Sequence, residues 1–404
     1  MKWFYLAWLN LGRNRRRTLA SLVLTAVAVL ALMSSKGFAD YTLDALRQAS
    51  IREHGHLVIS HQHYFNQQEQ QPLEWGLENH QQLQQQLLAK PEVEQVLASV
   101  RFDGLISNGE KSTIFLAEGI ELAAQQLQGL QASLRQGQLL SQIDAQADPQ
   151  VLLGQSLAHN LGVEVGDYLT LLSTTTSGAL NALDVQLVGL VNTGIPDVDS
   201  RLVLTELSAA QELLLTDKVS KLAVYLSHEL LQQSSQQQWQ ALWPELQIGG
   251  WQDHAHYYHN VAGLYERLFG VLGLILMMMV VFAIFNTASM SVMERTREIG
   301  TLAAMGTKKR EILWLLLLEA GFLAALGALI GLALAAMLSQ GLHWAQIPMP
   351  PAPGQSDSYP LLSHWSFSTA LETSLMLIIL AMLAALIASW NTLKKPIVEA
   401  LNHV

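Results

Sequence analysis

Two long apolar runs separated by a short charged stretch constrain this chain more than any other feature. The run Leu268–Met293 holds no charged side chain, and the run Ile312–Leu338 holds only Glu319. Each run exceeds the roughly 20 residues that an α-helix needs to cross about 30 Å of hydrocarbon. The sequence therefore predicts two membrane-spanning helices, joined at one membrane face by a tight loop at residues 294–311.

The distribution of charge predicts on which side of the membrane each segment lies. The loop carries five basic residues between Arg295 and Arg310, and an excess of Lys and Arg is typical of cytoplasmic loops. The first 17 residues hold five basic and no acidic side chains, whereas residues 37–262 hold 25 acidic and nine basic ones. Both termini are therefore expected in the cytoplasm, with one large domain outside. The overall net charge of −10 argues against a nucleic-acid partner.

The remaining boundaries follow from hydropathy and proline content. The first apolar run is an anchor that stays rather than a cleaved signal peptide, because its basic start is amphipathic and aromatic. The predicted order is a cytoplasmic amphipathic entry segment (1–17), transmembrane helix 1 (18–36), an external domain (37–262), transmembrane helix 2 (266–293), the cytoplasmic loop (294–311), transmembrane helix 3 (312–339), an external proline-rich loop (340–368), transmembrane helix 4 (370–393) and a cytoplasmic tail (394–404).

The composition agrees with a mixed architecture. With 50% hydrophobic and 14% charged residues, the chain is too apolar for an ordinary soluble protein and too polar to lie wholly in a membrane. In the external segment, short apolar runs typical of strands alternate with helical patterns. We expect a glutamine-rich helix at 78–97, strands at 99–106 and 112–117, and a helix around 239–246. The predicted fold class is an α-helical membrane protein with four transmembrane helices and a large external α/β domain between the first and second.

The charged loop has an apolar face. Ile299, Leu302, Ala303 and Gly306 recur at helical spacing, as in a short helix that inserts into a groove of a soluble partner. Periodicity alone would favour a loop whose charges only fix the topology. The candidate coupling residues are Glu294, Arg295, Arg297, Glu298, Ile299, Gly300, Leu302, Ala303 and Gly306.

The order of these residues resembles a known family. Glu294-Arg295, then 297–300 (Arg-Glu-Ile-Gly), then Leu302, Ala304 and Gly306, between two apolar spans, is similar to the cytoplasmic coupling loop of FtsX/MacB-type ABC transporter permeases. The order of elements at 151–215 also resembles the MacB-like periplasmic core domain, with a β-rich subdomain inserted at about 118–200. The layout is most similar to that of lipoprotein-releasing system permeases.

The resemblance implies a function. Such a chain is the permease subunit that couples ATP hydrolysis by a partner to motion of its periplasmic domain, in the bacterial inner membrane. The implied substrate is a lipoprotein or a lipid-like molecule; macrolide-exporter-type efflux and a non-transporting mechanotransducer acting on a periplasmic enzyme are the alternatives. The implied partners are two copies of an ABC ATPase, a second permease copy or a paralogue, membrane lipid, and a periplasmic carrier or adaptor.

The sequence carries no ATP-binding motif of its own. No G-x-x-x-x-G-K-[ST] occurs in the sequence, so ATP and Mg²⁺ are expected in the partner ATPase and no catalytic residue is expected in this chain. Histidines gather at the two ends of the external domain and could bind a metal, but such tracts also suit exposed strands, and no metal site is predicted. These histidines are His54, His56, His61, His63, His254, His256 and His259.

The predicted spans contain a few positions with a specific expected role. Glu319 is an acidic residue within transmembrane helix 3, for which we expect a structural role in the helix bundle. Gly327 and Gly331 have the small-xxx-small spacing that allows close helix contact, although glycine is common in membrane helices. A substrate cavity is predicted at the outer ends of the first two spans, lined by Leu30, Met33, Leu268, Val271, Leu272 and Ile275.

Overall fold

The computed structural model of the chain describes residues 6–7, 10, 15–64, 72–141, 148–294, 298, 300–301, 305–349 and 359–393. The chain divides into two compact units, which we treat separately. The membrane unit comprises residues 1–44, 261–349 and 360–404, and the external domain comprises residues 45–260 and 350–359.

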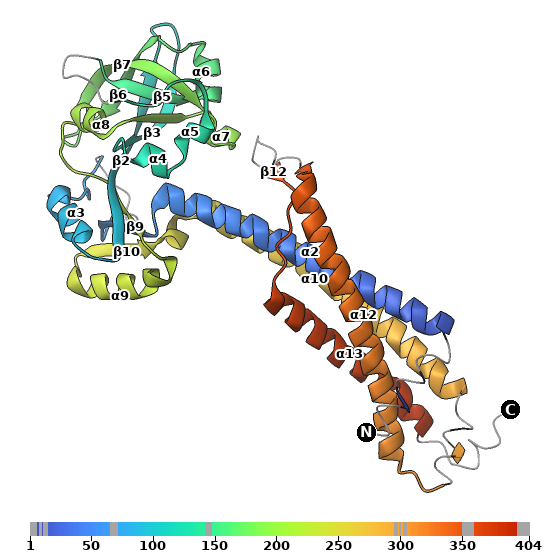
Figure 1. The fold of residues 1–404 in the computed structure, drawn as a ribbon. Helices are drawn as coiled ribbons and strands as arrows, with labels where there is room; N and C mark the ends of the chain where they lie inside the picture. The colour runs from blue at the N-terminus through green and yellow to red at the C-terminus, as the bar shows by residue number, and fades with distance from the viewer. Residues whose placement is uncertain are drawn as a thin grey trace. The chain divides into compact units, whose positions relative to one another are not determined.

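The membrane unit is built from four long apolar helices (Figure 1). They are α2 (Arg15–His54), α10 (His256–Glu294), α12 (Lys309–Ala345) and α13 (Phe367–Leu393). Each is long and apolar enough to cross a membrane. Helix α12 continues to Ala345, beyond the predicted end of the third span, and the short strands β11 (Pro348–Met349) and β12 (Tyr359–Pro360) pair in the connection that follows.

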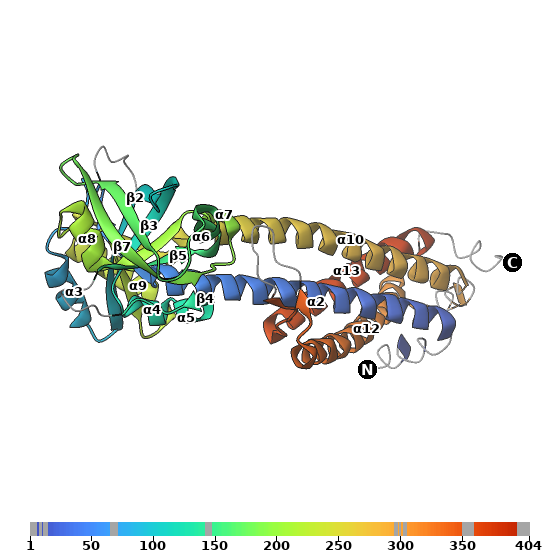
Figure 2. The same ribbon diagram turned by 90° about the horizontal axis from the view of Figure 1, so that it is seen from above.

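Small side chains fill the interior of the membrane unit. Its buried cluster is rich in alanine, with Ala324 on α12 and Ala381 and Ala385 on α13 fully buried. Small residues allow helix backbones to approach closely, which matters because lipid supplies no hydrophobic driving force between apolar helices. Helices α2 and α10 run side by side in both views (Figures 1 and 2).

The external domain contains a ten-stranded sheet, part of which closes on itself. Strands β2 (Val93–Ser107), β3 (Ser112–Ile120), β8 (Leu202–Glu206), β5 (Gln150–Gly154) and β7 (Leu180–Val191) are neighbours in that order. Strand β6 (Tyr168–Thr174) pairs with both β7 and β2 and so closes a six-stranded barrel. The short strand β4 (Leu134–Gly137) is added at β7.

The first half of β2 belongs to a second, open part of the sheet. There β2 pairs with β9 (Lys221–Leu226), which is followed by β1 (Leu57–His61) and the edge strand β10 (Leu246–Gly250), all antiparallel. Gly104 lies where β2 turns into the barrel, and a Cβ at this position would collide with the carbonyl oxygen of Leu172 on β6. This strand thus connects the open sheet to the barrel.

Short helices cover the sheet. They are α3 (His80–Leu88), α4 (Ala124–Leu127), α5 (Leu130–Ser133), α6 (Gln155–Leu161), α7 (Pro196–Asp199), α8 (Leu207–Leu214) and α9 (Gln232–Leu242), with 3-10 turns at Glu229–Leu231 and Trp251–His254. The main hydrophobic core lies under these helices and inside the barrel, and it includes Phe115, Leu153 and the fully buried Trp239.

Two helix predictions were wrong in extent. The helix expected at 78–97 ends at Leu88, and residues from Val93 onward form β2, because Pro91 cannot continue a helix and β-branched residues favour a strand. The helix expected around 239–246 is α9, which begins seven residues earlier and ends at Leu242. The glutamine-rich stretch 232–240, for which a solvated helix face is expected, belongs to this helix.

Candidate functional site

Most of the predicted coupling residues lie outside the part of the chain that the structure describes. These are Arg295, Arg297, Ile299, Leu302 and Ala303. The flanking residues are described: Glu294 is the last residue of α10, and Glu298 and Gly300 have helical backbone. Gly306 has a φ of 92°, a left-handed conformation that glycine adopts without strain, just before α12 begins. A turn at residues 305–306 therefore precedes α12, and the docking face stays a prediction.

Glu319 has a polar partner within the membrane unit. Its carboxylate, half-buried on α12, accepts a hydrogen bond from the side-chain amide of Asn10. The predicted entry segment and the third span are thus linked through a partly buried polar contact, which is the kind of pairing that an acidic residue needs in an apolar environment.

Gly327 and Gly331 lie against the first span. A Cβ at Gly327 would be 2.7 Å from the Cβ of Thr25, and one at Gly331 would be 2.7 Å from the Cβ of Val29. One turn before Thr25, the Ser21 hydroxyl lies 2.7 Å from the hydroxyl of Thr287 on α10. Helix α2 is therefore packed closely against α12 and hydrogen-bonded to α10.

An open groove lies in the membrane unit between α2 and α10, with α13 at its border. Its volume is about 760 Å³. The apolar part of its wall includes Leu32 and Ala39 of α2, and Phe269, Leu272 and Met277 of α10. The size and the apolar lining suit an acyl chain or another small amphiphile.

The predicted cavity residues agree with this groove only in part. Leu272 lines it, but Met33 is 3% exposed and packs inside the helix bundle, and Leu30 packs against the same interior. The remaining three, Leu268, Val271 and Ile275, are exposed without lining the groove. Topology predicts the depth of a residue in the membrane, whereas the side of the helix on which it lies depends on packing, which the sequence alone left open.

Charged and aromatic side chains surround the outer end of the groove. Lys36, Asp40, Glu266 and Glu372 are among the lining residues, and the Lys36 ammonium lies 3.8 Å from the Glu372 carboxylate. Tyr265 also lines the groove, with its ring centroid 5.6 Å from that of Phe269. The groove therefore has an apolar interior and a polar, aromatic mouth.

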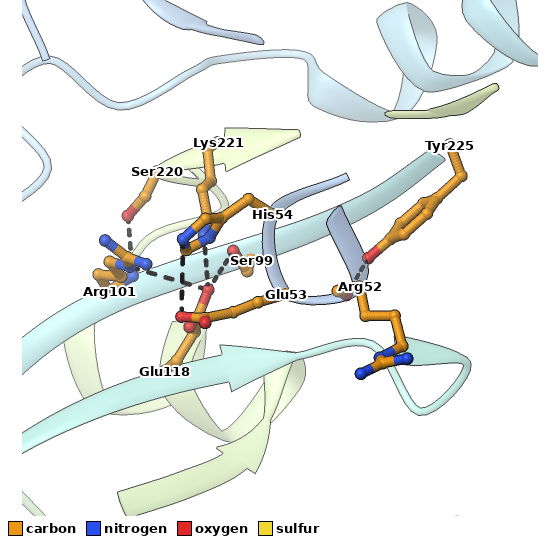
Figure 3. A network of polar contacts seen from close by, with 9 residues as sticks. All are labelled: Arg52, Glu53, His54, Ser99, Arg101, Glu118, Ser220, Lys221 and Tyr225. Carbon is orange, nitrogen blue, oxygen red and sulfur yellow. Dashed lines mark hydrogen bonds and ion pairs between the residues drawn. The ribbon is translucent and has the colours of Figure 1, made fainter. Parts of the chain in front are cut away.

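In the external domain, a network of charged groups lies where α2 ends (Figure 3). The Lys221 ammonium, on β9, is 3.0 Å from the Glu118 carboxylate on β3. The Ser99 hydroxyl donates a 2.8 Å hydrogen bond to the same carboxylate oxygen, and the Arg101 guanidinium lies 3.9 Å from it. Two strands, β2 and β9, thus direct polar groups at one carboxylate on β3.

The network shifts the pKa of both members of the central pair. Burial alone would raise the pKa of Glu118, but the charges of Lys221 and Arg101 and the hydrogen bond from Ser99 lower it to about 2. Lys221 is only 3% exposed, and this burial lowers the pKa of its ammonium although Glu118 opposes the shift. Each charge is therefore held inside the domain by the other.

The end of α2 is fixed to the same strands by hydrogen bonds. The Tyr225 hydroxyl on β9 donates to the carbonyl oxygen of Arg52 at 2.8 Å, near the helix C-terminus. Gly55, with a φ of 79°, closes the helix by donating its N–H to Ile51, and its Cβ position lies 2.8 Å from the backbone nitrogen of Val224. Only glycine meets both requirements, the left-handed conformation and the close approach to β9.

Several of the histidines make hydrogen bonds or ring contacts within the external domain. His56 Nδ1 accepts a 3.1 Å hydrogen bond from the N–H of Leu226, and burial lowers the pKa of this imidazole. His61 and His63 pack on Trp75, with ring centroids 5.2 and 5.0 Å from it. No group of three or more metal-ligating side chains lies together among the described residues.

The remaining histidines of the two groups are placed as follows. His54 is buried, and His259 Nε2 lies 2.9 Å from the carbonyl oxygen of Gln252. The side chains of His254 and His256 lie outside the described set.

Four apolar helices with an α/β domain between the first two define a class of membrane permease. Residues 18–242 match the MacB-like periplasmic core domain, and residues 270–397 match the FtsX-like permease C-terminal domain. The chain therefore belongs to the FtsX/MacB-type family of ABC transporter permeases, as its loop residues suggested. Members of this family are permease subunits of ABC transporters.

Individual relatives are distant. The chain is 26% identical over 199 residues to the lipoprotein-releasing system transmembrane protein LolC of Neisseria meningitidis serogroup B, covering 46% of this chain and 47% of that protein. It is 40% identical over 57 residues to an uncharacterized ABC transporter permease, MJ1507, of Methanocaldococcus jannaschii, covering 14% of each. The matched region thus spans less than half the length of either curated relative. The periplasmic region of MacB from Actinobacillus actinomycetemcomitans matches with a TM-score of 0.37 and 16% identity, covering 52% of this chain and 96% of that structure.

Proposed function

We propose that this permease extracts or translocates a lipoprotein or a lipid-like substrate from the membrane, with energy from a partner ATPase. The groove between α2 and α10 carries the proposal, since it joins an apolar interior to a charged mouth at the outer ends of two spans. An acyl chain loses about 0.8 kcal/mol per CH₂ on leaving an apolar environment, so it needs such a surface on its route out of the bilayer. The relation to LolC supports the same substrate class.

Energy would reach the groove through the helices that line it. The coupling residues between Glu294 and Gly306 would bind the ATPase, which would hold ATP and Mg²⁺. Helix α2 contains the first span, lines the groove and continues to His54 beside the Glu118–Lys221 pair in the external domain. A displacement of α2 would therefore act on the groove and on the sheet of the external domain together.

The assembly we propose has two ATPase copies and two permeases, either identical or paralogous, in the inner membrane of a bacterium. Both termini and the loop 294–311 would lie in the cytoplasm and the external domain in the periplasm, where a carrier or adaptor would receive the substrate. Efflux of amphiphilic drugs through the same groove is the second candidate, because the groove is open and has room for a molecule of that size.

A photo-crosslinker at Leu272, which lines the groove, tests the proposal. In cells whose partner ATPase binds ATP without hydrolysing it, we expect this position to capture lipoprotein or lipid. The same crosslinker at Ile330, exposed on α12 away from the groove, is the control, since it reports contact with bulk lipid alone. Capture at Leu272 no greater than at Ile330, together with higher drug sensitivity when the chain is deleted, would favour efflux instead.

A further inference from the structure

The mouth of the groove has an uneven charge. Its lining contains three carboxylates, Asp40, Glu266 and Glu372, and one cation, Lys36. Lys36 is paired with Glu372 at 3.8 Å, whereas Asp40 and Glu266 form no ion pair with any residue that the structure describes. The two unpaired carboxylates come from different helices, α2 and α10, on the two walls of the groove.

Aromatic rings lie at the same end. Tyr265 directly precedes Glu266, and Phe269, one turn further along α10, also lines the groove. Phe38 of α2 extends this cluster, with its ring centroid 6.0 Å from that of Tyr265. Aromatic faces and carboxylates together attract organic cations, because both present negative charge to an ammonium group.

We propose that the groove selects amphiphiles by the charge of their head group, and that it takes an acylated molecule with a cationic ammonium head in preference to an anionic one. The acyl chain would lie along Leu32, Leu272 and Met277, and the ammonium group between Asp40 and Glu266. An anionic head would meet an excess of negative charge in the same place. This inference rests on the proposed function only in treating the groove as a site for lipid-like molecules.

A binding experiment on the purified full chain in maltoside micelles tests it without ATPase or transport. Two photoreactive probes with the same twelve-carbon chain are compared, one ending in trimethylammonium and one in sulfonate, and labelled peptides are identified by mass spectrometry. We expect the ammonium probe to label the groove helices about three- to tenfold more than the sulfonate probe, the range expected for partly exposed charge pairs and cation–π contacts. In the double variant Asp40→Asn/Glu266→Gln, that ratio should fall close to one. Glu311→Gln, which removes an exposed carboxylate at the start of α12, should leave the ratio unchanged.

Filling the groove provides a second test. Gly270 lines the groove and a Cβ there meets nothing within 4 Å, so Gly270→Phe should fit without disturbing the helices and should abolish labelling by the ammonium probe. Gly341→Phe is the matched control, because Gly341 has equally open surroundings and lies on α12 outside the groove.

The outcomes separate this inference from the proposed function. Equal labelling by both probes overturns the charge preference and leaves a groove for lipid of any charge, as does labelling that persists in the double variant. If neither probe labels the groove helices, as would follow if a second permease copy covers the groove, the charge preference is also overturned. The crosslinking at Leu272 in cells tests the proposed function separately.

Discussion

Replacing Lys221 by methionine should destabilise the external domain by about 3 kcal/mol at neutral pH. The pKa of Glu118 is about 2 against an ordinary value of 4.5, and each pKa unit corresponds to about 1.4 kcal/mol. Because the carboxylate is only 16% exposed, little of this is lost to solvent screening. The variant keeps Arg101, at 3.9 Å, as a weaker partner, but it leaves a buried carboxylate without its closest counter-charge.

The stability that Glu118 contributes depends on pH in a defined direction. A carboxyl whose pKa is lowered by folding contributes stability that is present above its unfolded pKa and is lost as the pH falls through its folded pKa. The wild-type protein should therefore lose the contribution of Glu118 between about pH 4.5 and pH 2. Lys221→Met should flatten this loss, so that the difference between the two proteins shrinks as the pH falls.

Hydrogen exchange of peptides from β3 and β9 in the full chain measures both effects, with variant and wild type compared at the same pH. At pH 7 the loss corresponds to roughly a hundredfold faster exchange, if these strands open with the whole domain. Lys111→Met, on the exposed β2–β3 turn, is the control and should change exchange little. A loss below about 1 kcal/mol for Lys221→Met, or a wild-type pH profile in the variant, would refute the electrostatic reasoning.

The double variant Glu118→Gln/Lys221→Met separates a pair contribution from simple damage to the core. Removing one charge leaves the other buried without a partner, whereas removing both leaves no unpaired charge behind. The double variant should therefore be more stable than the sum of the two single losses predicts. Strict additivity would show that the two side chains act independently.

Three further predictions concern other parts of the chain. Tyr225→Phe should cost about 1 kcal/mol and speed hydrogen exchange at the C-terminal turn of α2, because it removes one hydrogen bond and keeps the ring. Gly331→Leu should weaken the contact between α12 and α2, and lower the midpoint of thermal unfolding in micelles, since its Cβ alone would approach Val29 to 2.7 Å. Leu302→Glu should abolish co-purification of the ATPase while the permease still inserts, and normal yield of the ATPase would disprove the docking face.

Hydropathy was sufficient to predict the four membrane helices, because a membrane span is a property of about 20 consecutive residues. Such a signal does not depend on what the helix packs against. The family could likewise be inferred from the loop 294–306, a compact stretch in which order and spacing are both informative. The external domain was predicted as α/β, but its closure into a barrel depends on β6 pairing with β2, which is distant in sequence, in addition to its neighbour β7, and no local pattern indicates this.

The ion network could not be predicted for a similar reason. Glu118 and Lys221 are about a hundred residues apart, and a lone lysine in an apolar strand is usually exposed. The run from Lys221 to Leu226 does offer one signal, since Lys221 begins a stretch with no other charged residue. In the structure all six residues are buried, and a strand with no solvated face must pair its cation internally. Gly55 offers another, because a glycine directly after a long helix indicates a left-handed helix end.

Helix α2 is where these separate observations meet. Its side chains contact Gly327 and Gly331 of α12, its outer end forms one wall of the groove, and its last turn is bonded to β9. A change in any of these contacts alters the environment of the same helix. Variants at the Tyr225 bond and at the groove mouth should therefore influence each other's effect on transport more than either influences ATPase binding, because the ATPase would contact the loop after α10 and not α2. Additive effects of Tyr225→Phe and Asp40→Asn on transport would show instead that the groove mouth and the last turn of α2 work independently.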